Sequence, residues 1–419
     1  MPHKPLDCPR LRWPLATEDF EHNGSQYLVL RDPQGVAEKP ALIPIPLVPV
    51  ISRFNGNTTL ESIVNEAGSF GLTMEMALRL ADDLDEMCFL DTPATQKKFR
   101  ELERDFFESP VRREALAGAV YPAEPGELKA ALEKYLAGAE NTFEKPSEQA
   151  ELVGLVCPHI DYARGWRTYA SAYSALERSE APDVVMLLGT SHSGGRSIYQ
   201  LTRKDFQSPL GTFTTAQPIV DRLVSVMGEN QSFRDEYLHK REHSLELQLP
   251  FLAYRYRNGD RPEIVPILVG SFHHFLEKQI SPVSGGEVAD FVGALAEVTK
   301  GLRAAGRRVL FYGGVDLAHV GMHFGDEERM DDAKLEVVRS RDRELLDAVL
   351  AGDEERLFAH MAEDCDKRRI CGFPSMYTML AAMRRAGIQL HGHFIEYRQA
   401  VDRQSDCVVT FASACWTVG

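Results

Sequence analysis

The sequence predicts an α/β fold in which helices cover a mainly parallel β-sheet, with a small α+β domain in front of it. Four short apolar runs, most of them rich in β-branched residues, recur beyond residue 150 with helical segments between them. Continuous apolar runs separated by helices are typical of parallel sheets buried on both faces. A length of 419 residues also favours two or three domains over one. The four predicted strands span residues 151–159, 183–192, 263–270 and 308–316.

The composition limits the classes of function. Hydrophobic residues make up 44% and charged residues 26%, which is ordinary for a globular protein with a large core. The net charge is −15, and no cluster of Lys and Arg is long enough to offset it, which argues against binding to nucleic acid. No stretch approaches the roughly 20 apolar residues that span a bilayer, and the N-terminus lacks the apolar core of a signal peptide. We therefore expect a cytoplasmic protein that does not bind membranes, with most of its seven scattered cysteines reduced.

Residues 1–92 differ in sequence pattern from the rest and are predicted to form the N-terminal domain. Residues 25–35 are typical of a hairpin arm, and helices are expected to begin at Thr58 and at Thr73. A short strand over residues 88–92 would follow. Helix, helix and strand in this order, with an Asn-Gly turn before them, indicate a winged-helix-like domain that resembles the PqqD-like peptide-binding domains. A structural N-terminal cap is the alternative.

The segment that follows, residues 93–116, is charged and helix-prone, and we interpret it as a connecting helix. Residues 117–419 are predicted to form the large α/β domain.

Polar residues with metal-binding side chains stand at the ends of three of the four strands. His159 ends the first run in CPHIDY, His192 follows the second in GTSHSGG, and Asp316 and His319 follow the fourth in GGVDLAHVG. A single histidine after a strand is usually structural, but ligands of open α/β sheets bind at the carboxyl ends of the strands, where these side chains would meet. Imidazole and carboxylate together suit zinc, iron, copper or manganese. The repetition therefore predicts a metal site.

Cys371 is a further candidate ligand. It lies in ICGFPSMY, at a turn before a helical run, so its sulfur is expected near a helix N-terminus, which lowers a thiol pKa and favours the thiolate. A thiolate would favour softer or redox-active ions. The alternative is a buried, inert cysteine.

Glu242 and His243 are adjacent in HKREHSLELQLPF. An acid beside an imidazole can move protons near a metal, and it can equally form a structural ion pair. The pattern leaves both interpretations open.

Eight motifs beyond residue 117 resemble, in order, those of the Memo family, known in bacteria as AmmeMemoRadiSam system protein B. One departure concerns the family's Pro-His-Ala-Gly-Tyr, which reads PHIDY here, so that Asp161 would change the charge of the pocket or add a ligand. The N-terminal domain is an addition to the minimal family fold. The eight motifs are AGAVYPAEPGELKAAL, CPHIDYARGW, LLGTSHSGG, SPLGTF, REHSLELQLPFL, PILVGSF, GGVDLAHVG and CGFPS.

The resemblance implies a fold like that of the class III extradiol dioxygenases and one iron or copper ion per chain, bound by two histidines and a cysteine. By motif, these ligands fall on His159, His192 and Cys371. It also implies four further residues in or near the same pocket, which would move protons or orient a bound water: Asp316, His319, His243 and Glu242.

The expected function is therefore a metal-dependent redox enzyme, dioxygenase-like in fold, that acts on a peptide or small molecule beside a radical-SAM partner. Ring cleavage itself follows only from fold analogy, which does not establish a reaction. Two alternatives remain: a peptide-binding adaptor with a vestigial metal pocket, and a copper carrier.

Overall fold

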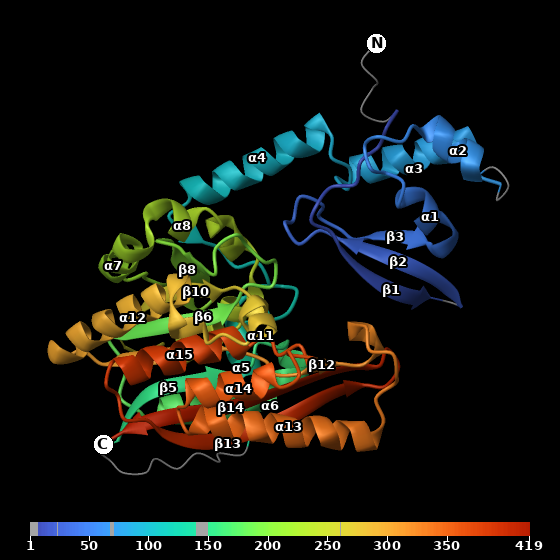
Figure 1. Cartoon of the computed structure of the whole chain (residues 1–419). Helices are drawn as coiled ribbons and strands as arrows, with labels where there is room; N and C mark the ends of the chain where they lie inside the picture. The colour runs from blue at the N-terminus through green and yellow to red at the C-terminus, as the bar shows by residue number, and fades with distance from the viewer. Residues whose placement is uncertain (1–6, 23, 68–70, 140–149, 260) are drawn as a thin grey trace. The chain divides into compact units, whose positions relative to one another are not determined.

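The computed structural model describes residues 7–22, 24–67, 71–139, 150–259 and 261–419, and its chain forms two compact units, Met1–Ser109 and Pro110–Gly419 (Figure 1). Each unit has its own buried apolar core. No helix among the described residues is both long enough and apolar enough to cross a membrane.

The first unit pairs a three-stranded antiparallel sheet with helices. Thr59 caps α2, because its hydroxyl accepts the N–H of Ser62, so this helix begins two residues after the predicted Thr58. Thr73 caps α3 as predicted. The predicted strand at 88–92 is reduced to a single bridge between Leu90 and Leu11, since Thr92 already caps the next helix. In chain order the elements are β1 Ala16–His22, β2 Ser25–Arg31, β3 Ala41–Pro44, α1 Val48–Ile51, α2 Leu60–Ala67, α3 Met74–Glu86 and α4 Pro93–Glu108.

The segment 93–116 is divided between the two units. Helix α4 ends at Glu108, and the chain then enters the second unit as β4 (Val111–Arg112), which pairs with β8 (Asp205–Ser208). Only the first part of the predicted connecting helix is therefore helical.

The second unit has an eight-stranded sheet whose centre is parallel, as the sequence predicts. The order of its strands is β12-β14-β5-β11-β6-β10-β7, with β13 paired to β14. The four predicted apolar runs are the four central strands, which pair in parallel with one another. These strands are β5 Glu151–Cys157, β11 Val309–Gly314, β6 Val184–Thr190 and β10 Glu263–Val269.

Antiparallel strands complete the sheet at its two edges. β14 pairs with β5 on one side, and β7 pairs with β10 on the other. The sheet is therefore mixed rather than uniformly parallel. The outer strands are β7 Tyr199–Leu201, β12 His319–Val320, β13 His391–Asp402 and β14 Cys407–Val418, and β9 Gly211–Phe213 pairs with β8 in the small sheet that contains β4.

Helices cover both faces of this sheet (Figure 1). Val184, Met186 and Leu188 of β6 belong to one buried cluster, and Val185 and Leu187 belong to the other, as the pleat of a strand between two helical layers requires. The first cluster includes side chains from α7 Gln217–Met227, α12 Gly286–Ala304, α13 Asp332–Leu350, α14 Glu354–Ala362 and α15 Phe373–Arg385. The second includes side chains from α5 Pro125–Gly138, α6 Tyr162–Glu177 and α10 Leu249–Arg255. The short helices are α8 Glu229–Phe233, α9 His243–Glu246 and α11 His273–Lys278.

Candidate metal centre

The carboxyl ends of three neighbouring strands place the predicted ligands together. β5, β11 and β6 are adjacent in that order, and His159, Asp316 and His192 follow them. Cys371 comes from the turn before α15. The ligand atoms of His159, His192 and Cys371 all lie within 4.8 Å of one another, and Cys371 Sγ is 3.2 Å from His159 Nε2.

The turn that carries Cys371 is fastened to the ends of two strands. The hydroxyl of Thr190 donates to the Cys371 carbonyl at 2.9 Å, and the N–H of Gly372 donates to the Asp316 carbonyl at 3.1 Å. A Cβ on residue 372 would lie only 2.6 Å from the Asp316 carbonyl oxygen. The glycine of the CGFPS motif thus permits the close approach that holds Cys371 beside the histidines.

Hydrogen bonds select the tautomer of each candidate histidine ligand. His159 Nδ1 lies 2.9 Å from the carbonyl oxygen of Gly314, and His192 Nδ1 lies 2.9 Å from Glu242 Oε1. An oxygen acceptor at Nδ1 holds the proton there and leaves the Nε2 lone pair for a metal. Burial, reinforced by the neighbouring His192 and His243, also lowers the pKa of His159 well below its usual range. A neutral imidazole is the form that binds metals.

Glu242 organises this side of the centre. Its carboxylate accepts the backbone N–H groups of His192, His243 and Ser244 as well as the ring N–H of His192. Burial alone would raise the pKa of Glu242, but His192 and His243 outweigh it and hold that pKa well below its usual range. Glu242 is therefore an ionised anchor.

A second possible donor set, His192 with Glu242 and His243, also lies within 4.8 Å. We favour the set with Cys371, because the Glu242 carboxylate already accepts four N–H groups. His243 stacks on His192 with ring centroids 4.4 Å apart, and its Nδ1 lies 3.1 Å from Glu242. Burial lowers the pKa of His243, but the hydrogen bond and charge of Glu242 outweigh this effect and raise it.

Asp316 lies against the candidate ligand His159. Its Oδ1 accepts the backbone N–H of His159 at 2.9 Å, and its Oδ2 is 3.8 Å from His159 Nε2. Burial raises the pKa of Asp316 to about 7, although the His159 backbone N–H opposes the shift. This carboxyl group can exchange a proton near neutral pH.

His319 lies nearby but belongs to neither donor set. Its Nδ1 is 3.1 Å from the carbonyl oxygens of both Leu317 and Arg369, and burial lowers its pKa to about 4. His319 is therefore neutral at pH 7 and offers Nε2 as a proton acceptor.

The thiol of Cys371 departs from the sequence-based expectation. A helix N-terminus was predicted to lower its pKa, whereas burial, followed by the negative charge of Asp316, raises it well above its usual range. The prediction was wrong because the sequence does not show how much water the site excludes. A bound cation supplies the positive charge that favours a thiolate in such surroundings.

Comparison with known proteins decides the family. The family model described as Memo-like protein matches residues 112–415, which is most of the chain. The chain belongs to the Memo-like protein family. Its relatives include the MEMO1 family proteins of Aquifex aeolicus (26% identity, 94% of this chain and 96% of the relative), Methanosarcina acetivorans (27%, 72% and 98%) and Thermus thermophilus (27%, 76% and 86%).

The relatives differ in how much of the chain they match. The Aquifex aeolicus alignment covers 94% of this Memo-like chain and therefore includes most of the first unit, whereas the Methanosarcina acetivorans alignment covers 72%. A solved structure, of an uncharacterized protein from Escherichia coli K12, aligns with 64% of the chain at 15% identity and a TM-score of 0.37, a likeness too weak to support an argument.

The residue that departs from the Memo motif, Asp161, caps a helix. Its carboxylate accepts the backbone N–H of Arg164 at the start of α6 and also binds the Arg164 guanidinium at 2.6 Å. Asp161 belongs to neither donor set among the described residues. The expectation that it adds a ligand therefore gains no support, and Arg164 offsets its charge.

Sequence reasoning missed the buried ion pair that anchors the Glu242 segment of this Memo-like chain. Arg112 on β4 pairs with Glu246 on α9, and both side chains are almost fully buried. Arg112 also donates to the carbonyl oxygens of His239 and Glu242. Because 134 positions separate the two partners, no local pattern could have linked them.

Proposed function

We propose that this Memo-like chain is a redox enzyme that holds one iron or copper ion through His159 Nε2, His192 Nε2 and Cys371 Sγ. One observation carries the proposal. In both His159 and His192, Nδ1 faces an oxygen acceptor, so Nε2 is left to bind a metal. A ligand atom of each ring also lies within 4.8 Å of the Cys371 sulfur. Two nitrogens and one sulfur suit iron or copper. Such an ion, when bound, supplies electron transfer and open positions for oxygen or substrate.

The surrounding residues would manage protons. Asp316, whose pKa is about 7, can take a proton from a substrate or return one. His243 is more exposed, with 37% of its side chain accessible, and Glu242 favours its protonated form, so it would exchange protons with solvent. His319, neutral at pH 7, would orient a water or substrate hydroxyl through Nε2.

The test is the metal content of protein purified without oxygen. We expect about one iron or copper ion per chain by elemental analysis, as the three donors form one site, and electron paramagnetic resonance would distinguish the two metals. C371S should lose most of this metal. C365S is the matched control, since Cys365 is also a free cysteine of the same loop but lies outside the donor set.

The outcome also separates the alternatives. Tight copper(I) binding without oxygen-dependent turnover would favour a carrier. Absence of stoichiometric metal, with C371S identical to the parent protein in binding a peptide, would favour an adaptor and overturn the enzyme proposal.

Family context alone supports the remaining part of the proposal, a radical-SAM protein as partner. Co-purification of the two proteins would test it.

A further inference from the structure

A second cavity lies at the opposite end of the sheet from the metal centre. It has a volume of about 670 Å³ and is lined by residues at the amino ends of β6, β10 and β11 and by the segment after α10. Asp183 lines it, while His192 belongs to the metal centre, and the seven residues of β6, Val184–Thr190, lie between them and span roughly 20 Å. The volume is typical of sites for small molecules.

Arginines dominate the charge of this cavity. Its described lining residues include five arginines against three carboxylates, an excess of two positive charges in a chain whose net charge is −15. Arg307 pairs with Glu263 at 2.7 Å, and Arg308 pairs with Glu180 at 2.8 Å. Glu180 does not line the cavity, so with these two pairs set aside three arginines, Arg255, Arg257 and Arg261, face two lining carboxylates, Glu177 and Asp183.

These three guanidinium groups are held by groups without charge. Arg255 donates to the carbonyl oxygens of Leu176 and Ser179, and Arg257 donates to that of Tyr254. Within the part of the chain that the structure describes, Arg255, Arg257 and Arg261 form no ion pair. Each guanidinium has five N–H donors, so most of their capacity to bind an anion remains.

The Arg261 side chain is held by contacts with residues 210–212. Its guanidinium lies over Gly211, where a Cβ would be 1.9 Å from Nη1, and it donates to the carbonyl oxygens of Leu210 and Thr212. Gly211 has a φ of +124°, a conformation that glycine adopts readily. Burial lowers the pKa of Arg261. A partly buried guanidinium group that has no ion-pair partner among the described residues is stabilised by an anion that binds beside it.

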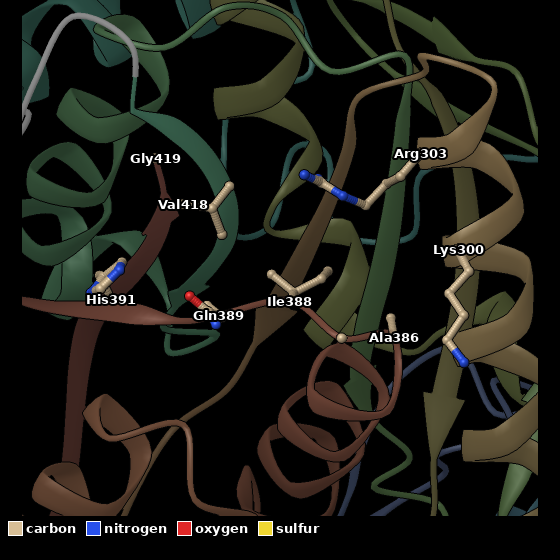
Figure 2. A pocket seen from close by; sticks show the side chains of 9 residues that line it. Lys300, Arg303, Ala386, Ile388, Gln389, His391, Val418 and Gly419 are labelled. Atoms are coloured by element: carbon tan, nitrogen blue, oxygen red, sulfur yellow. The ribbon is translucent and has the colours of Figure 1, made fainter.

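A smaller cavity near the C-terminus differs in this respect. Figure 2 shows Lys300 and Arg303 on one side of it and His391 with Val418 on the other. Here the cations are neutralised, because Arg303 forms a double hydrogen bond with Glu151 and Lys300 pairs with Glu297 at 2.7 Å. In the larger cavity, by contrast, Arg255, Arg257 and Arg261 have no ion-pair partner among the described residues.

We propose that the arginine cavity, lined by Arg255, Arg257 and Arg261, binds a small molecule that carries a phosphate or diphosphate group. The planar forks of the guanidinium groups bind phosphate oxygens in pairs. The site does not depend on the proposed metal or on redox activity.

Calorimetric titration of the full chain with inorganic pyrophosphate tests the proposal. The buffer has low ionic strength and contains a chelator, and C371S is titrated in parallel so that metal-bound pyrophosphate cannot be mistaken for binding at the cavity. We expect saturable binding of one pyrophosphate per chain, equal in C371S, and at least tenfold weaker in R257Q and in R261Q. R257Q keeps the test valid if R261Q fails to fold, because Arg257 is exposed.

R385Q is the matched control, since Arg385 also donates to two backbone carbonyl oxygens but does not line the cavity. It should bind like the parent chain. Tighter binding of ADP than of pyrophosphate would identify a nucleotide as the source of the group, and equal binding would indicate recognition of the diphosphate alone. No saturable binding, an equal loss in R385Q, or binding of citrate without pyrophosphate would overturn the proposal.

Discussion

At the scale of single residues, the candidate metal centre depends on groups that orient the ligands. The Glu242 carboxylate accepts the Nδ1–H of His192 and the backbone N–H groups of His192 and His243. In E242Q, the side-chain NH₂ group would replace one carboxylate oxygen and would face N–H groups that now donate to that oxygen. The resulting repulsion would displace the His192 ring. We predict a metal affinity 10–100 fold lower in E242Q, measured by competition with a chromophoric chelator.

E236Q is the control for this loss, because Glu236 lies in the preceding turn and accepts a hydrogen bond from Thr202. Its metal affinity should equal that of the parent chain. An equal affinity in E242Q would show that His192 does not need its carboxylate partner.

Asp316 gives a prediction about pH in the metal-free protein. Its pKa is about 7 in the folded chain, against an ordinary value of 3.8, so the folded state binds the proton more tightly than the unfolded state does. The contribution of this group to stability is present below pH 3.8 and is lost as the pH rises through 7. The free energy of unfolding of the parent chain should therefore fall, relative to that of D316N, by about 2 kcal/mol as the pH rises from 5 to 8. Urea unfolding with a chelator present measures this difference.

The exposed carboxylate of Asp290 supplies the comparison. D290N should follow the parent chain at both pH values. If the free energies of unfolding of D316N and of the parent chain change equally with pH, burial does not raise the pKa of Asp316, and the prediction is wrong.

The sequence could predict which residues meet but not their state. His159, His192 and Asp316 follow strands, and strand ends converge in any parallel sheet, so their proximity was predictable. The environment of Cys371 and the choice between an ion pair and a proton shuttle at Glu242 depend on contacts between distant segments. Those contacts are visible only in the folded chain.

At the scale of elements, apolar runs were sufficient for the parallel centre of the sheet and insufficient for its edges. The predicted runs became β5, β6, β10 and β11 because each is buried on both faces. The antiparallel strand β14 is just as buried, but its place beside β5 depends on a pairing between residues more than 250 positions apart. Local patterns carry no information about such a pairing.

The ion pair between β4 and α9 leads to a stability prediction. Glu246 accepts the Arg112 guanidinium, the Tyr121 hydroxyl and two backbone N–H groups, all in a buried setting. E246Q leaves Arg112 as an uncompensated buried charge, which costs about 3–5 kcal/mol. The free energy of unfolding in urea, followed through the fluorescence of buried Trp416, measures this loss.

The partly exposed pair of Arg303 and Glu151 is the control, and E151Q should cost less than about 1 kcal/mol. The double variant R112M/E246M should be more stable than E246Q, because it removes both buried charges. Equal costs for E246Q and E151Q would contradict a buried role for Glu246.

At the scale of the whole molecule, the chain is two units with separate cores, and every proposed metal-site residue lies in the second. Their boundary follows Ser109, and the match to the Memo-like family begins at residue 112. We therefore predict that a fragment of residues 110–419 folds alone and binds metal within about threefold of the full chain's affinity.

A fragment of residues 117–419, which starts where the sequence placed the large domain, should behave differently. It lacks β4 and Arg112, so Glu246 is buried without its cation and the carbonyl of Glu242 loses a donor. We expect it to unfold about 3–5 kcal/mol more easily than the 110–419 fragment and to bind metal more weakly. Urea unfolding and chelator competition on the two fragments measure both effects. Equal behaviour would mean that the seven residues from Pro110 to Leu116 merely connect the units, rather than supporting the segment that holds Glu242.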